Sequence, residues 1–380
     1  MMMLRKKNVG ILTLPFNNNY GGFLQAYALL SVLKKMGFNA EIISRRHNRK
    51  SRSWFVKKLA KNLIKKILGR SPVFVIPNPE KTLLFKGAEM MSFVKKYVVP
   101  QTQPFFSSRE LERNCNGRYD VYLAGSDQLW RPDYVSEIEN YFFSFVKDDA
   151  AKLISYAASF GVDDPCYTET QKKECGRLIA RFSAVSVREK SGIDVIKKMG
   201  WKTQFPPEQV LDPTLLLGQE HYSSLIADMP RNQEKNVFCY ILDGGEKLNK
   251  IADAVCNEMK ASKKMIIDPY HWQEEAYILP PVEQWLSGFR DASFVVTDSF
   301  HGMVFSIIYK KAFVVYVNKE RGCDRFYTLL DCLDLRNRII TDAENVKDVV
   351  RNAIDWSRVN ELLEKRKIDS LFFLKEALDK

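Results

Sequence analysis

The hydrophobic pattern of the chain predicts buried strands, each followed by a polar turn and an apolar helix. Short apolar runs rich in β-branched residues occupy 8–14, 120–124, 184–187, 236–242, 264–267 and 292–296. Such runs are typical of strands in the interior of a sheet. Apolar residues at helical spacing follow over 23–36, over 247–262 and from Val304 onward. This alternation predicts an α/β fold with parallel sheets.

Polar residues gather at the turns between these strands and helices. The turn TDSFHG at 297–302 carries a lone histidine, and three other turns, at 16–22, 125–130 and 188–192, carry Asn, Asp, Ser and Arg. Ligands of open α/β sheets bind beyond the carboxyl ends of the strands, where helix N-termini favour an anion. If the histidine-bearing turn stood alone, a structural histidine that caps the helix would explain it. Four polar turns at strand ends instead favour a crevice that they share.

Six motifs, in their order and spacing, resemble the polysaccharide pyruvyl transferase family. They are NYGGFLQAYAL at 19–29, GSDQLW at 125–130, SYAASFG at 155–161, SVREKSG at 186–192, LDPT at 211–214 and TDSFHG at 297–302. Members of that family are similar to double-Rossmann (GT-B-like) glycosyltransferases. They move the enolpyruvyl group of phosphoenolpyruvate onto a sugar and form a pyruvate ketal. The resemblance implies two Rossmann-like domains that face each other across a crevice, with phosphoenolpyruvate as donor substrate and no further cofactor.

The length of 380 residues suits two domains. We expect an N-terminal, acceptor-side domain over 1–211, a linker over 212–235, a C-terminal, donor-side domain over 236–358 and a helix over 359–380 that packs back. No apolar stretch approaches the roughly 20 residues of a membrane span, and we find no signal peptide. Seven scattered cysteines without a CxxC pair favour reduced thiols in the cytoplasm.

The net charge of +12 is concentrated in one segment, because 45–70 contains eleven Lys or Arg and no Asp or Glu. Within this insertion, which we place at 45–80, Phe55, Leu59, Leu63 and Ile67 recur every four residues. The pattern is typical of a basic amphipathic helix. It either packs on the N-terminal domain or contacts an anionic membrane beside a lipid-linked acceptor. Nucleic acid is disfavoured because the apolar stripe is aliphatic rather than aromatic.

The resemblance assigns the donor side of the reaction. His301 matches the catalytic histidine that exchanges protons with the donor, and Arg188 matches an arginine of the donor pocket. Some members carry an arginine two residues before the histidine, where this chain has Ser299. The candidates to replace it are Arg321 and Arg325, for which surface ion pairs with Glu320 or Asp324 are the alternative. Anion contacts are also expected around Phe300 and Gly302.

The acceptor sugar is expected to meet the turns of the N-terminal domain. Asp127 either acts as a base on a sugar hydroxyl or caps the following helix. No cluster of His or carboxylate residues has the spacing of a metal site. The acceptor-binding candidates are Asn17, Asn19, Gly21, Gln25, Ser126, Asp127, Gln128, His271 and Trp272.

Two other functions fit parts of the sequence. A glycosyltransferase that uses a nucleotide-sugar donor would share the architecture and bind a nucleoside diphosphate in the C-terminal domain. A non-enzymatic membrane adaptor would use the basic segment 45–70 and leave the crevice without chemistry. The glycosyltransferase differs from a pyruvyl transferase in the donor that it binds. The membrane adaptor differs because its function would not be affected by the loss of His301.

Overall fold

The computed structural model describes residues 6–49, 86–243, 245–267, 278–318 and 322–379. The basic segment from residue 50 onward, His271, Trp272 and Arg321 lie outside the described residues, so the expectations for them stay predictions. Among the described helices, none is both long and apolar enough to span a bilayer.

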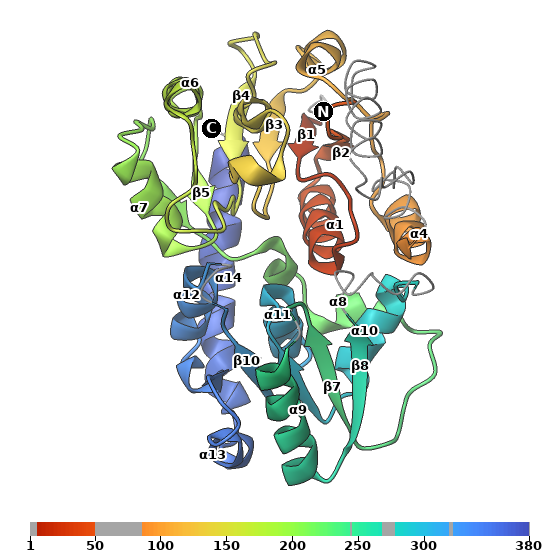
Figure 1. Ribbon diagram of the computed structural model, residues 1–380. Coiled ribbons are helices and arrows are strands. Elements are labelled where there is room, and N and C mark those ends of the chain that lie inside the picture. The colour runs from red at the N-terminus through yellow and green to blue at the C-terminus, as the bar shows by residue number, and fades with distance from the viewer. Residues whose placement is uncertain (1–5, 50–85, 244, 268–277, 319–321, 380) are drawn as a thin grey trace, which may run out of the picture.

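Two parallel sheets form the centres of two domains, one above the other in Figure 1. In the first domain the strand order is β2-β1-β3-β4, and isolated bridges from β4 and from Ala158 continue it to the pair β5-β6. In the second domain the order is β11-β10-β9-β7-β8. The strand bounds are β1 Asn8–Leu12, β2 Asn39–Ile43, β3 Val121–Ala124, β4 Lys152–Ser155, β5 Ser186–Val187, β6 Glu208–Gln209, β7 Asn236–Ile241, β8 Ser262–Ile267, β9 Phe294–Thr297, β10 Phe313–Tyr316 and β11 Ile339–Ile340.

Helices follow most of the strands. The first domain contains α1 Tyr20–Lys35, α4 Ala88–Tyr97, α5 Ser108–Cys115, α6 Glu169–Ile179 and α7 Lys190–Lys198, with the short helices η1 Pro132–Tyr134 and η2 Ile138–Phe142. The expected linker holds η3 Pro213–Leu216 and α8 Gln219–Ser224. The second domain contains α9 Glu246–Met259, α10 Val282–Asp291, α11 Phe300–Ile308, α12 Asp324–Cys332, η6 Arg336–Arg338 and α13 Val346–Arg351, and α14 Trp356–Asp379 ends the chain.

The strand order in each sheet reverses around one strand. In the first domain β1 lies between β2 and β3, and in the second β7 lies between β8 and β9. Ligands of such sheets bind at the carboxyl side of the point of reversal. The two Rossmann-like domains facing each other, as predicted from the sequence, are therefore confirmed.

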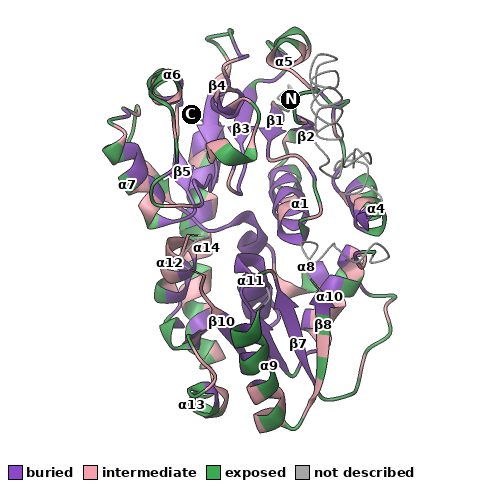
Figure 2. Cartoon of the chain, in the orientation of Figure 1, coloured by how far each residue is buried: buried purple, intermediate pink, exposed green. Residues whose placement is uncertain are grey.

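Aromatic side chains join the domains at the start of α1. The ring of Tyr20 stacks on Trp285 of α10, with centroids 5.3 Å apart, and meets Tyr240 of β7 edge-on at 5.9 Å. Its hydroxyl donates to the carbonyl of Pro280 at 2.7 Å. Figure 2 shows α1 and α11 largely buried, and one continuous apolar core contains residues of both.

The C-terminal helix α14 runs along both domains (Figure 1). Near its start Val359 is buried in the second domain beside Leu333 and Leu335. Farther along, the hydroxyl of Ser370 accepts from the backbone of Leu211, and Lys7 of the first domain donates to the carbonyl of Leu378 at 2.7 Å.

Two helices begin earlier than their apolar pattern indicates. The helix expected from Phe23 starts at Tyr20, because the Asn19 side chain accepts from the backbone of Gly22 at 3.1 Å. The helix expected from Val304 starts at Phe300, because the hydroxyl of Ser299 accepts from Gly302 at 3.2 Å. As a correction to the sequence-based expectation, His301 lies in the first turn of α11 rather than in the turn before it.

Candidate active site

A cavity of about 120 Å³ lies between the two domains at the carboxyl ends of their strands. The first domain contributes the turns after β1, β3 and β5, and the second contributes β7 with the starts of α11 and α12. The two points of strand reversal therefore share one cavity. Its lining residues are Asn18, Asn19, Asp127, Gln128, Tyr134, Arg188, Tyr240, Leu242, Ser299, Phe300, His301 and Arg325.

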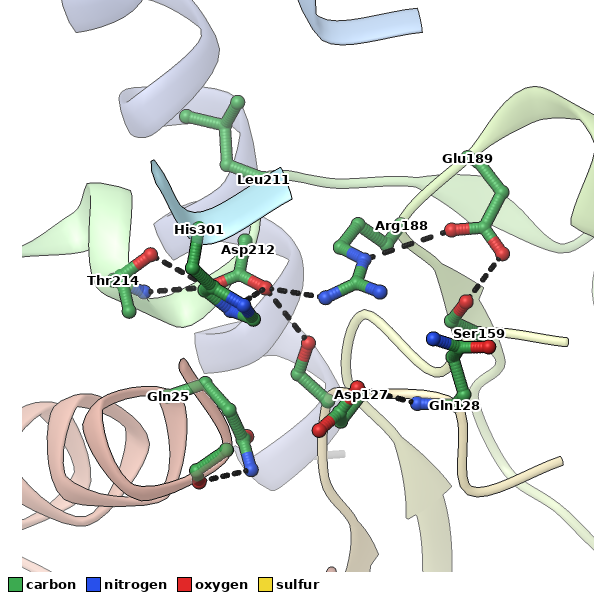
Figure 3. A network of polar contacts seen from close by, with 12 residues as sticks. Gln25, Asp127, Gln128, Ser159, Arg188, Glu189, Leu211, Asp212, Thr214 and His301 are labelled. Atoms are coloured by element: carbon green, nitrogen blue, oxygen red, sulfur yellow. Dashed lines mark hydrogen bonds and ion pairs between the residues drawn. The ribbon is translucent and has the colours of Figure 1, made fainter. Parts of the chain in front are cut away.

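Beneath this cavity, Asp212 is the centre of a buried polar network (Figure 3). One carboxylate oxygen, Oδ2, lies 2.8 Å from Nη1 of Arg188 and 3.6 Å from Nε2 of His301, and accepts from the hydroxyl of Ser126. The other oxygen accepts from the backbone and hydroxyl of Thr214, at 3.0 and 2.7 Å. Burial raises the pKa of Asp212, but His301 and Arg188 outweigh burial and hold the pKa well below its ordinary range. Asp212 therefore remains a carboxylate.

Arg188 follows β5 and is only 4% exposed. Its guanidinium lies over the ring of Phe300, 4.4 Å from the centroid, and its Nε is 3.6 Å from Glu189. Burial lowers the pKa of Arg188, but the charges of Asp212, Glu189 and Asp127 raise it by more than burial lowers it. The pKa of Arg188 is therefore above its ordinary value. Nε and Nη2 have no hydrogen-bond partner among the described residues. Arg188 is thus a permanent cation with unused donors.

Arg325, at the start of α12, approaches the same ring from another position, 5.9 Å from its centroid. Its Nε is buried and has no hydrogen-bond partner among the described residues. Burial and the charge of Arg188 lower the pKa of Arg325 to about 10, so it stays charged at neutral pH. Asp324, its expected ion-pair partner, instead accepts from the backbone of Ser191 at 2.8 Å.

His301 is held between the domains and is 7% exposed. A Cβ added to Gly21, in the first turn of α1, would overlap the imidazole at Nδ1. On the other side, Gly302 packs so closely on Thr297 that a Cβ there would overlap the Thr297 hydroxyl, which itself donates to the carbonyl of Tyr240 at 2.6 Å. Gly21 therefore limits where the imidazole can lie, and Gly302 keeps the start of α11 close to Thr297 of β9.

Asp127 combines an unusual backbone with an unsatisfied side chain. Its φ is +80°, in the left-handed region that non-glycine residues rarely adopt. Its Oδ1 accepts from the backbone of Gln128 at 2.9 Å, whereas the buried Oδ2 has no hydrogen-bond partner among the described residues. A strained residue with an open acceptor in a cavity is a candidate for ligand contact.

Only some of the predicted acceptor-binding residues line the cavity. Asn19, Asp127 and Gln128 line the cavity, and Gly21 packs on His301. Gln25 lies inside the first domain, where its amide donates to Thr13 and to the carbonyl of Gly22. The remaining two are not among the lining residues: the hydroxyl of Ser126 donates to Asp212, and the backbone carbonyl of Asn17 accepts from the backbone of Asn19.

Asp212 and Glu189 were not among the predicted site residues. Asp212 lies in the LDPT motif, and an Asp before Pro-Thr has the composition of an ordinary turn. Its pairing with Arg188, 24 residues earlier, arises only from the fold. Among the described residues, no group of three or more His, Cys, Asp or Glu is arranged to hold a metal ion.

Three solved structures resemble the chain over nearly its whole length. The chain is similar in structure to a Medicago truncatula protein complexed with UDP-glucose (11% identity, 100% of this chain and 99% of that chain, TM-score 0.49). It is also similar to an Arabidopsis thaliana protein complexed with quercetin (12%, 97% and 98%, 0.48) and to UDP-N-acetylglucosamine 2-epimerase from Rickettsia bellii (8%, 97% and 96%, 0.47). Likeness at this level carries no functional argument. Among curated proteins, none matches the chain.

The sequence itself matches a family. The family model for polysaccharide pyruvyl transferase covers residues 19–320, which include parts of both domains and each described residue of the cavity except Asn18 and Arg325. The chain belongs to the polysaccharide pyruvyl transferase family.

Proposed function

We propose that the protein transfers the enolpyruvyl group of phosphoenolpyruvate to a sugar of a polysaccharide precursor and closes a pyruvate ketal. The observation that carries this proposal is the pair of guanidiniums, Arg188 and Arg325, on one ring, Phe300, beside His301. Both have buried N–H groups without a hydrogen-bond partner among the described residues. Phosphoenolpyruvate offers two anionic groups, a carboxylate and a phosphate, to such a pair.

Arg325 supplies, in this proposal, the cation that some family members carry two residues before the histidine. Ser299 stands at that position and is engaged as the N-cap of α11. The backbone N–H groups at the start of α11 add a further attraction for an anion. The donor therefore binds between α11 and α12, with no cofactor beyond the donor itself.

The cavity of about 120 Å³ is compatible with a small donor such as a three-carbon phosphate. The acceptor sugar then occupies the side of the first domain, near Asn19, Asp127 and Gln128.

The chemistry assigned to these residues balances in two steps. His301 gives a proton to the methylene carbon of the donor, and a sugar hydroxyl attacks C2 and loses its own proton, for which the open Oδ2 of Asp127 is the candidate acceptor. A second hydroxyl then attacks C2, the bond from C2 to the phosphate oxygen breaks, and the second hydroxyl proton leaves with the phosphate. Arg188 and Arg325 stabilise the departing phosphate.

The test is the thermal shift of the purified protein with phosphoenolpyruvate and, separately, with nucleoside diphosphates. A ligand at 100 times its Kd stabilises the fold by ≈ 2.7 kcal/mol. We expect a shift with phosphoenolpyruvate that is lost in Arg188→Ala and kept in the control Arg177→Ala, whose side chain is exposed on α6 and paired with Glu174. A shift with a nucleoside diphosphate alone would contradict the proposal and indicate a nucleotide-sugar enzyme.

A further inference from the structure

Tyr134 is an exposed aromatic residue at the cavity, and the proposed donor site does not use it. It ends the short helix η1 and lines the cavity on the side of the first domain. Tyr134 is 40% exposed, whereas Asp127, Arg188 and His301 of the same cavity are each at most 7% exposed. Small-molecule sites combine aromatic surfaces with a few polar groups. Tyr134 therefore offers apolar surface to a ligand that enters the cavity from solvent.

Arg131 holds the ring of Tyr134 in place. Its guanidinium lies over the ring, 4.5 Å from the centroid, and its Nη1 donates to the Tyr134 hydroxyl at 3.4 Å. The same nitrogen donates to Oε1 of Gln128 at 3.2 Å, which ties the ring to another lining residue. Pro132 restricts the backbone at the start of η1. Because the ring is ordered before a ligand arrives, binding costs little conformational entropy.

The polar groups on this side of the cavity suit hydroxyl groups. Asn18, Asn19 and Gln128 line it, and a carboxamide both donates and accepts hydrogen bonds. Because Arg131 engages Oε1 of Gln128, the amide N–H groups of Gln128 are the donors that it offers to a ligand. Asp127 adds a buried acceptor, Oδ2, without a hydrogen-bond partner among the described residues. An aromatic face bordered by such groups fits a ring with C–H faces and a hydroxyl-bearing edge.

The ring of Tyr134 lies close to the donor side of the cavity. Tyr134 and Arg325 both line the cavity. Burial has the largest effect on the pKa of Arg325, which it lowers, and the phenol of Tyr134 is near enough to act on the same pKa. A sugar stacked on Tyr134 would therefore lie next to the bound donor, as attack of its hydroxyl on C2 requires.

We propose that Tyr134 is the stacking platform of the acceptor and that it selects a pyranose ring with a continuous face of C–H groups. The inference rests on the proposed function, which places the acceptor sugar on this side of the cavity. The face of an aromatic ring is negative and attracts the slightly positive hydrogens of C–H groups. A pyranose presents such hydrogens together on one face, whereas an open-chain polyol with similar hydroxyl groups does not.

Saturation-transfer NMR titrations measure this contact. The probes are methyl glucoside, methyl galactoside and methyl mannoside, with and without inorganic phosphate, and the open-chain hexitol glucitol is the control ligand. The wild type should bind at least one of the three hexosides more tightly than glucitol. Tyr134→Ala should raise the Kd of that hexoside by about tenfold, and Tyr134→Phe, which keeps the ring, should restore most of the affinity.

The matched control is Phe205→Ala, which removes another exposed aromatic side chain. Phe205 is 63% exposed, precedes β6 and is not among the lining residues, so its loss should leave the Kd of the hexoside unchanged. Tyr134→Ala should keep the thermal shift with phosphoenolpyruvate, because Arg188 and Arg325 remain. A general loss of structure would instead weaken hexoside and donor binding together. If Tyr134→Ala does not fold, Tyr134→Leu, which is apolar but has no ring, replaces it.

Each outcome decides a different point. Hexoside binding to Tyr134→Ala as tight as to the wild type, or glucitol binding as tight as hexoside binding, would overturn the stacking. Equal losses in Tyr134→Phe and Tyr134→Ala would assign the contact to the hydroxyl and overturn it as well, and so would a wild type that binds none of the three hexosides. In these cases a thermal shift with phosphoenolpyruvate leaves the proposed function standing. Its absence in the wild type would overturn both proposals.

Discussion

At the scale of single residues, one buried carboxylate organises the groups that the proposal uses. Asp212 contacts Arg188 and His301 with the same oxygen, and Thr214 anchors its other oxygen. A buried ion pair is costly to break because one charge is then left without a partner. The network therefore holds Arg188 in position and presents His301 with a fixed negative charge.

Replacement of this carboxylate tests the network through stability. We expect Asp212→Asn to lower the free energy of unfolding at pH 7 by about 3–5 kcal/mol, because Arg188 loses the closer of its two carboxylates. The pKa of Asp212 is lowered in the folded state, so its contribution is present above its ordinary pKa and is lost as the pH falls through the folded value. The difference between wild type and variant should therefore narrow below about pH 4.

Urea unfolding at pH 7 and at pH 3 measures this difference. The matched control is Asp164→Asn, which removes an exposed carboxylate paired with Lys198 and should cost at most about 1 kcal/mol. An Asp212→Asn protein as stable as the control would show that the pair with Arg188 contributes little.

Replacement of the proposed acid tests the chemistry. His301→Ala should reduce turnover of phosphoenolpyruvate by about 10² to 10⁴, the usual contribution of a general acid or base. Donor affinity at pH 8 should fall much less, because the two arginines remain. Phosphate release and ketal formation are measured with a panel of hexosides. Equal losses in turnover and in donor affinity would assign His301 to binding instead.

At the scale of elements, the start of α1 fixes the position of the imidazole in α11. The methyl group of Gly21→Ala would overlap Nδ1 of His301. At Gly22, its neighbour in the same helix, an added methyl group would lie 3.2 Å from Asn19 and 3.4 Å from Oδ2 of Asp127, and the imidazole is not among its nearest neighbours. The two adjacent glycines thus compare overlap with His301 against a closer approach to two other cavity residues.

We expect Gly21→Ala to lower turnover by at least tenfold and Gly22→Ala to change it much less. Ala is favoured over Gly in a helix by about 1 kcal/mol, which offsets only part of the overlap in Gly21→Ala. Steady-state kinetics and thermal melting of the two variants give the comparison. Equal activity of the two variants would mean that the imidazole can move away without consequence.

At the scale of the whole molecule, the cavity exists only while the domains stay together. Gly322, with φ +80°, lies against the carbonyl of Gly161 in the other domain, and a Cβ there would overlap it. α14 adds a second connection, since the backbone N–H of Leu211 donates to Ser370. Contacts far from the chemistry therefore set the distance between the donor and acceptor sides.

Gly322→Ala should separate the domains near the cavity and weaken donor binding. The control is Gly200→Ala, which has a similar φ of +69° but open space around its Cα. Both variants carry the backbone strain of about 1–2 kcal/mol for a side chain in the left-handed region. Only Gly322→Ala should reduce the thermal shift with phosphoenolpyruvate and increase the radius of gyration in small-angle scattering. An identical response of the two variants would exclude a role for this contact.

The sequence was sufficient for six of the eleven described strands, and the resemblance of its motifs indicated the double-Rossmann fold and the family, because local apolar patterns and the order of motifs do not depend on distant contacts. It was less informative about individual polar residues. Gln25 and Ser126 belong to the family motifs, yet their side chains form hydrogen bonds inside the protein. The neighbours of Arg325 in sequence are polar, as they are for many surface residues. Only the packing of α12 beside Phe300 places Arg325 at the cavity.

By itself, then, the sequence determined six of the buried strands, the position of four polar turns and the histidine that belongs to one of them. The tertiary structure decided which charges meet. Asp212, Arg188 and His301 come from three separate segments of the chain, and their distances depend on how two domains pack. Electrostatic interaction depends on distance and burial, which local patterns do not encode. For that reason the polar network around Asp212 follows from the fold alone.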